Sequence, residues 1–256
     1  MCSEWQIWSQ NHWGHSAMYI ANQSSKKQAA DQLPPITQRQ PNSTVHGLIA
    51  IGVEFVMLAV LIALVPVIVY IDVTILSDRM SEESLTEFLH NALLFVSIAF
   101  VVTGAFKYAL ARGYLLLVAT FFLCLFIREC DALFDNIWQG FWIIPALSVL
   151  TVGIALVYRN RGTLTEPLLR HFETRPATFI YIGVLLLLIF TRLFGTGSLW
   201  EAVMGSSYSS SYKTAIQEGL ELMSYTLIAY GSFISYIGRF GLSHSQKSRI
   251  DASQDV

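Results

Sequence analysis

The sequence predicts an all-α, polytopic membrane protein: a bundle of six transmembrane helices with both termini in the cytoplasm. Composition is the first observation, since 54% of the 256 residues are hydrophobic and 13% are charged, against roughly 25% charged in a soluble domain. The second observation is that the apolar residues come in six long blocks between polar ends. The third is a strong bias of basic residues toward alternate connections, which sets the orientation of such a bundle.

The chain divides into three regions. Residues 1–46 are rich in Gln, Asn and Ser and are predicted to form a flexible, polar cytoplasmic tail. The three tryptophans in this tail could mark a membrane-surface or partner-binding segment, but the composition favours a disordered end. Residues 47–238 hold the six helices, and residues 239–256 form a second polar cytoplasmic tail.

Each apolar block has the length of about 17–25 residues that crosses the hydrocarbon core of a bilayer. The first block is too long and too far from the start for a signal peptide, and Pro66 is expected to kink it. The motifs "SLTE", from Ser84, and "TAIQ", from Thr214, predict capped starts for the second and sixth helices. The blocks are Gly47–Ile71, Phe88–Phe106, Tyr114–Cys130, Phe141–Tyr158, Ala177–Phe194 and Ala215–Ile237.

Basic residues set the orientation of the predicted bundle. Twelve Lys and Arg fall in the two tails and in the second and fourth connections, whereas four fall on the opposite side. Because the basic side faces the cytoplasm, we predict both termini inside, in a bacterial inner membrane. Acidic residues gather on the opposite, non-cytoplasmic side, and topology rules do not explain this accumulation.

Ionisable side chains from four predicted helices reach one depth in the non-cytoplasmic half. At 1.5 Å per residue, His90 lies ~9 Å and Glu221 ~10 Å inside its helix start. Ionised groups in a membrane face the bundle interior or water and find partners. Two arginines cannot neutralise five carboxylates, so protons, a cation, a metal ion or water must hold the surplus. The layer comprises the acids Glu87, Glu129, Asp131, Glu218 and Glu221, the bases Arg128 and Arg192, and the titratable His90.

The two glutamates of the last helix are predicted to have different roles. Glu218 would lie in the first turn after Thr214 and stabilise the helix start, so that Glu218→Gln is mild. Glu221, one turn deeper, would face Glu129, His90 and one of Arg128 or Arg192, and would exchange a proton or bind a cation, so that Glu221→Gln abolishes function. Capping accounts for Glu87 and Glu218 equally well, and Asp131 fits a wetted loop.

The metal chemistry that this layer suggests is limited. Glu87 and His90 form one Glu-x-x-His element, which partly resembles the di-metal site of helical bundles. The second element is Glu-x-x-Glu, so a di-iron site is not expected. A single Zn, Mn or Fe ion, held by His90, Glu129 and Glu221, stays open. The sequence contains no phosphate-binding loop, nucleophilic triad or nucleic-acid-binding basic patch, and no catalytic residue is assigned.

Three functions therefore stay open. The first is a proton- or cation-coupled transporter that uses the acidic layer, although the chain is small and lacks an inverted repeat. A homodimer would supply the missing half. The second is a membrane scaffold or accessory subunit, in which the layer serves assembly. The third is a membrane-embedded metal-dependent hydrolase, so whether the protein is an enzyme is undecided.

Overall fold

The computed structural model describes residues 41–76 and 84–241. The described residues form helices and connecting turns without a strand, which confirms the predicted all-α class. The chain separates into two compact units, Met1–Val56 and Met57–Val256. The boundary falls inside helix α2 (Pro41–Ile71), which stays helical through Pro66 and ends in a π-helical turn at Asp72–Leu76. Most of the two predicted tails lies outside the described residues.

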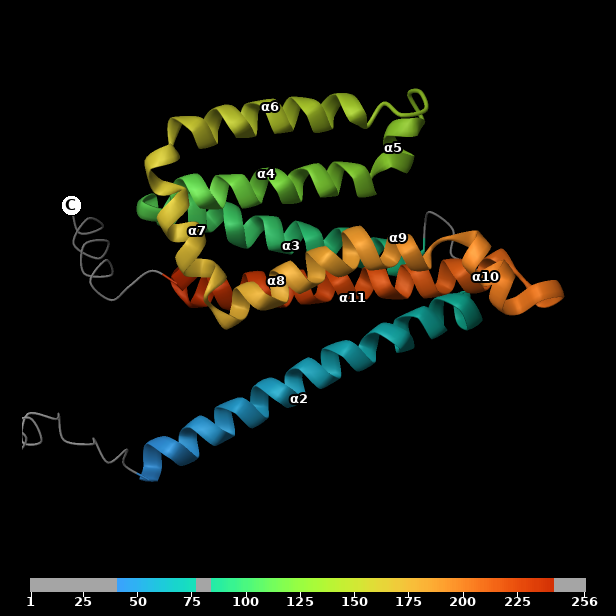
Figure 1. Cartoon of the computed structure of the whole chain (residues 1–256), viewed down its shortest axis with the longest axis horizontal. Coiled ribbons are helices and arrows are strands. Elements are labelled where there is room, and N and C mark those ends of the chain that lie inside the picture. Colours follow the sequence, from blue (N-terminus) through green and yellow to red (C-terminus); the bar gives the residue numbers. More distant parts are fainter. Residues whose placement is uncertain (1–40, 77–83, 242–256) are drawn as a thin grey trace, which may run out of the picture. The chain divides into compact units, whose positions relative to one another are not determined.

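Five long helical segments of the second unit pack side by side (Figure 1). Helix α4 packs between α6 and α3, and α11 packs between α3 and α8. Short helices α5 (Asp131–Asp135), α7 (Thr165–Phe172) and α10 (Gly197–Met204) connect them. The long segments are α3 (Leu85–Lys107), α4 (Arg112–Glu129), α6 (Ile143–Arg159), α8 (Arg175–Leu185) continuing through a π-helical turn (Leu186–Phe190) into α9 (Thr191–Phe194), and α11 (Ser210–Ile237).

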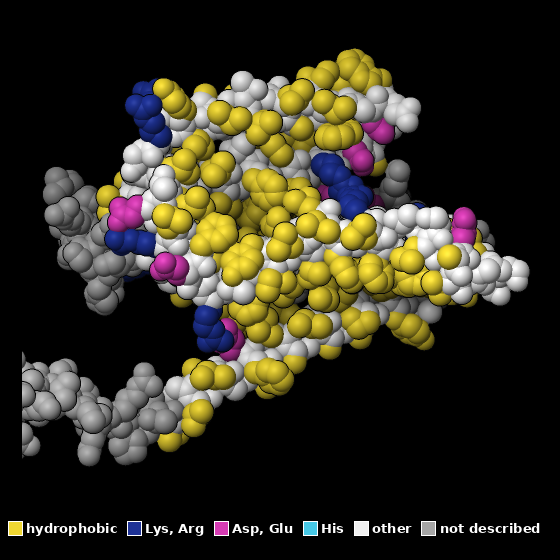
Figure 2. All heavy atoms as spheres, in the orientation of Figure 1, with side chains coloured by type: hydrophobic (Ala, Val, Ile, Leu, Met, Phe, Trp, Pro, Cys, Tyr) yellow, Lys and Arg dark blue, Asp and Glu magenta, His cyan; other side chains and the backbone are white. Residues whose placement is uncertain are grey.

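The apolar helices support an integral membrane bundle. Four helices are long and apolar enough to cross a bilayer: Gly47–Thr74, Leu85–Lys107, Ala109–Glu129 and Arg175–Phe194. A fifth span results if Ile143–Arg159 and Arg161–Phe172, which are bent by 82°, count as one. Helix α11 has 28 residues but carries too many polar side chains to qualify, so six spans are not established. Hydrophobic side chains cover much of the molecular face drawn in Figure 2, as expected for a surface in contact with lipid.

Glycines allow α8 and α11 to approach closely. A Cβ at Gly183 would lie 2.8 Å from the backbone oxygen of Ser224, and a Cβ at Gly231 would lie 2.8 Å from that of Pro176. Small residues at helix interfaces allow this approach in membrane bundles. The contact fixes α11, which carries Glu218 and Glu221, against the helix that leads to Arg192.

The start of α3 has two caps, of which the sequence predicted one. Ser84 is the N-cap, and its hydroxyl accepts a hydrogen bond from the Glu87 amide at 3.2 Å. Asp72 is the cap that the sequence did not reveal. Its buried carboxylate accepts from the amides of Leu85 at 3.2 Å and Thr86 at 2.8 Å, and from the Thr86 hydroxyl. A carboxylate at this end also favours the helix dipole.

Replacing Asp72 by Ala is expected to destabilise the start of α3. The change leaves buried donors without an acceptor, which costs about 1–3 kcal/mol. Thermal unfolding in detergent measures the loss, with Glu201→Ala, at an exposed position of α10, as the control. A melting temperature equal to that of the control would show that capping by Asp72 does not stabilise the protein.

The predicted start of the last helix is wrong. Helix α11 begins at Ser210 after the extended residue Ser209, and the Thr214 hydroxyl donates to the Ser210 carbonyl at 3.1 Å inside the helix. No glycine or proline separates residues 210 and 214, so nothing local stops the helix from extending. Glu218 therefore lies eight residues after the first helical residue, about two turns or ~12 Å inside.

Candidate functional site

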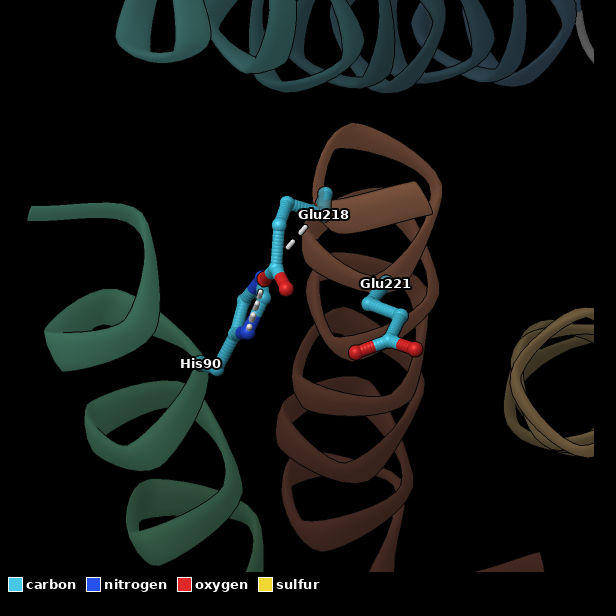
Figure 3. Close-up of side chains that lie close together, drawn as sticks. All are labelled: His90, Glu218 and Glu221. Carbon is cyan, nitrogen blue, oxygen red and sulfur yellow. Dashed lines mark hydrogen bonds and ion pairs between the residues drawn. The ribbon is translucent and has the colours of Figure 1, made fainter. Parts of the chain in front are cut away.

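His90 and Glu218 face each other between α3 and α11 (Figure 3). The His90 side chain is buried, and Glu218 retains 26% exposure. The Nε2 atom of His90 lies 3.2 Å from the backbone oxygen of Glu218. On the other side of the ring, Nδ1 lies 3.7 Å from Oε2 of the same residue. Both ring nitrogens are therefore directed at one residue.

The ring of His90 places Nδ1, a nitrogen without a hydrogen-bond partner among the described residues, opposite the carboxylate of Glu218. A carbonyl oxygen only accepts, so Nε2 carries the hydrogen that is donated to it. In a neutral imidazole, Nδ1 is then a lone pair, and it faces a carboxylate oxygen that also only accepts when ionised. At 3.7 Å the two atoms are beyond direct hydrogen-bond distance, and a proton, a metal cation or a bridging water between them would satisfy both.

Glu221 lies one turn further along α11 and is also buried (Figure 3). Its Oε1 accepts a hydrogen bond from Gln217 Nε2 at 3.2 Å and lies 3.9 Å from an Arg192 nitrogen. Arg192 is 45% exposed, whereas Glu221 is 6% exposed, so the pair joins a buried carboxylate to a base at the surface.

The π-helical turn precedes Arg192 by two residues. It spans Leu186–Phe190, and the Thr191 hydroxyl donates to the Leu187 carbonyl at 2.6 Å. A π turn inserts one extra residue and so rotates the following side chains about the helix axis by roughly 100°. Such turns are frequent at functional sites, and this one precedes the only arginine that pairs with Glu221 in the part of the chain that the structure describes.

Together, His90, Glu218 and Glu221 offer one ligand atom each within 4.8 Å of one another. The metal set predicted from the sequence contained His90 and Glu221 but had Glu129 as its third member. Glu218 takes that place in this group, because it lies two turns inside α11. One imidazole and two carboxylates form a donor set suited to Zn, Mn or Fe.

Glu129 lies beside this group and has a base of its own. It pairs with the adjacent Arg128, and its side chain is 9% exposed. It also interacts electrostatically with Glu221 and lies near the hydroxyl of Tyr225. That hydroxyl is buried, and Glu129 is its neighbouring hydrogen-bonding group. The ring centre of Tyr225 lies 5.4 Å from that of His90, so Tyr225 lies between Glu129 and the buried group.

A polar pocket of about 480 Å³ adjoins Glu129. It lies between the start of α3 and the end of α4, and Glu87 and Glu129 contribute carboxylates to it. Asp131 is not among the residues that line it, and its carboxylate accepts a hydrogen bond from the Ala132 amide at 2.8 Å. Glu129 thus connects the pocket to the buried group. The remaining polar lining comes from Ser84, Asn91, Cys130 and Asn136.

Cys130 offers a direct measure of access to this pocket. It follows the span Ala109–Glu129, and burial together with Glu129 and Glu87 raises the pKa of its thiol. We expect a membrane-impermeant maleimide to modify Cys130, at a rate that still increases with pH above 9, because the thiolate is the reactive form. Cys124, six residues earlier and directed at the Ala146 carbonyl, is the control. Single-cysteine proteins that label equally would contradict an open pocket.

A second buried histidine was missed in the sequence. His171, on α7, contacts the Tyr114 hydroxyl through Nδ1 and Ser235 Oγ through Nε2, the latter at 2.8 Å. It thereby joins α4, α7 and α11. The sequence placed it in a connection between spans, where no local pattern signals burial.

Of the other residues predicted from the sequence, Arg128 pairs with Glu129, Arg192 pairs with Glu221, and Glu87 lines the polar pocket. Gln217, which was assigned to a capping motif, is a further member of the site, four residues before Glu221 and on the same helix face.

Comparisons of the chain with protein-family models, with curated proteins and with solved structures found no match.

Proposed function

We propose that this protein is a proton- or cation-coupled transporter that binds a positive charge between His90, Glu218 and Glu221. The observation that carries the proposal is the pair of facing acceptors, Nδ1 of His90 and Oε2 of Glu218, at 3.7 Å. Burial makes an uncompensated charge there costly. A proton or a metal cation satisfies both atoms at once.

The surrounding charges support this proposal. The carboxylates of Glu87, Glu129, Glu218 and Glu221 outnumber the two arginines, Arg128 and Arg192, that lie among them. The polar pocket offers a cation a route to Glu129. If both termini are cytoplasmic, as the basic residues predict, this pocket opens on the non-cytoplasmic side.

A row of polar side chains along α11 extends the path. Tyr225, Ser232 and Ser235 follow Glu221 at intervals of 4, 11 and 14 residues, and all three are buried. These intervals place them on one helix face. Ser232 Oγ has no hydrogen-bond partner within the described residues, so a water is expected beside it. The buried Ile228 interrupts the row, and ordered water would have to bridge the gap.

Flux through proteoliposomes tests the proposal. Protons, Na⁺, K⁺ and Mn²⁺ are compared in turn across vesicles that contain the intact protein, Glu221→Gln or Glu129→Gln, with exposed Glu201→Gln as the matched control. We expect flux of one cation, abolished by Glu221→Gln, reduced by Glu129→Gln and unchanged in the control. If no cation moves, or if both site variants match the intact protein, the transporter proposal fails. Loss of a co-purifying protein in these variants would then favour an accessory subunit.

A metal-dependent hydrolase is the second candidate, because the three ligand atoms converge within 4.8 Å. A Zn, Mn or Fe ion held there would supply Lewis acidity and activate water. Elemental analysis after mild purification separates the candidates. Less than one ion per chain would argue against the hydrolase and would leave the transporter untouched.

A further inference from the structure

An apolar pocket of about 250 Å³ lies on the opposite half of the bundle from Glu129, between α4, α7 and α8. Leu117 and Phe121 contribute from α4, Phe172 from α7, and Ile180 and Val184 from α8. Figure 2 shows hydrophobic side chains over α4 and α8 in this region. Leu117, Phe121 and Phe172 remain 39%, 37% and 52% exposed, so the pocket is open along one side.

The polar groups at the pocket already have partners. His171 contacts the Tyr114 hydroxyl and Ser235, and the Tyr181 hydroxyl donates to Thr178 at 3.2 Å. The lining therefore offers a ligand carbon surface and no polar group in need of a partner. The volume is below the range of about 300–1,000 Å³ of pockets for drug-sized molecules. A narrow hydrocarbon chain fits these properties.

The chain segment that contains α7, one of the helices lining this pocket, is basic. Helix α7 follows an 82° bend after α6, so it runs across the direction of the spans. The segment 159–175 carries four arginines and two glutamates, a net charge of +2. One arginine, Arg170, pairs with Glu166, and Arg161 contacts the Tyr158 hydroxyl at 3.2 Å. The surplus of positive charge complements an anionic headgroup, since basic residues at a membrane surface attract anionic lipids.

We propose that the pocket binds one acyl chain of an anionic phospholipid, whose phosphate lies against the arginines of segment 159–175. The apolar lining holds the chain, and the arginines select the headgroup. This lipid site is separate from His90, Glu218 and Glu221 and does not depend on the proposed transport.

Native mass spectrometry of the full chain tests the lipid site. Protein in detergent is exposed to phosphatidylglycerol or phosphatidylcholine of equal chain length, and bound lipid is counted from the mass added. We expect one phosphatidylglycerol per chain and weaker binding of phosphatidylcholine. Arg159→Gln with Arg161→Gln should reduce the preference by roughly fivefold for each arginine, as expected at about 1 kcal/mol per charge.

Filling the pocket separates chain binding from headgroup binding. Val184→Trp and, independently, Leu117→Trp should reduce the retained lipid at least about tenfold. The control Leu147→Trp changes α6 at a position that is 55% exposed and should leave retention unchanged. Equal retention of both lipids by the intact protein overturns the proposal whether or not a variant folds. Full retention by a folded, pocket-filled variant overturns it as well.

Discussion

Glu218→Gln is expected to abolish cation binding while leaving the fold intact. The sequence predicted a mild effect, because it placed Glu218 in the first turn of a helix starting after Thr214. In the structure, Glu218 lies about two turns inside α11 and faces His90 at 3.7 Å. The amide of a glutamine donates a hydrogen to Nδ1 of His90, which removes the need for a cation.

The expected loss of affinity is at least about thirtyfold, since removing one partner of a buried charged pair costs about 2–5 kcal/mol. The affinity is measured by isothermal titration with the cation that the flux assay identifies. If that cation is H⁺, proton uptake after a pH jump is measured instead. Thermal unfolding should stay within a few degrees of the intact protein, and Glu201→Gln should change neither quantity. Wild-type affinity in the variant would show that His90 and Glu218 do not hold the ligand.

Gly231→Leu is expected to cause a large loss of stability, because α8 and α11 approach each other closely at this glycine. A side chain there meets backbone, since a Cβ would lie 2.8 Å from the Pro176 oxygen and 3.1 Å from the Ile180 nitrogen. Backbone cannot rotate away as a side chain can, so α8 and α11 must separate. Overpacking of this kind costs about 1–3 kcal/mol and occasionally more, or roughly 2–12 °C at 2–4 °C per kcal/mol for a chain of this size.

Separation of α8 from α11 should also weaken the site, because Arg192 follows α8 and pairs with Glu221 on α11. Thermal unfolding and cation affinity are therefore measured on the same protein. Gly162→Leu is the matched control, since a Cβ at Gly162 has no atom within 4 Å among the described residues. A Gly231→Leu protein as stable as this control would contradict the close approach of the two helices.

Local patterns predicted one helix start correctly and another wrongly. "SLTE" placed the N-cap of α3 at Ser84, because a serine hydroxyl and the amide three residues later suffice for that contact. "TAIQ" has the same form, but the residues before Thr214 are also compatible with a helix, which extends back to Ser210. The error moved Glu218 to a helix end and concealed Gln217 as the hydrogen-bond donor to Glu221.

Hydrophobicity and its spacing by themselves determined that the chain is all-α and suited to a membrane, because a bilayer leaves few ways to satisfy the backbone. The rise of 1.5 Å per residue also predicted a common depth for His90, Glu129 and Glu221, although it was counted from the wrong start of the last helix. The depth of a residue along a helix axis does not fix the rotation of the helix about that axis, and this rotation decides which side chains contact each other. Packing of α11 against α3 and α8, together with the π-helical turn before Arg192, placed Glu218 on His90 and Arg192 on Glu221. These contacts join residues as far as 128 positions apart, so only the tertiary structure decided them.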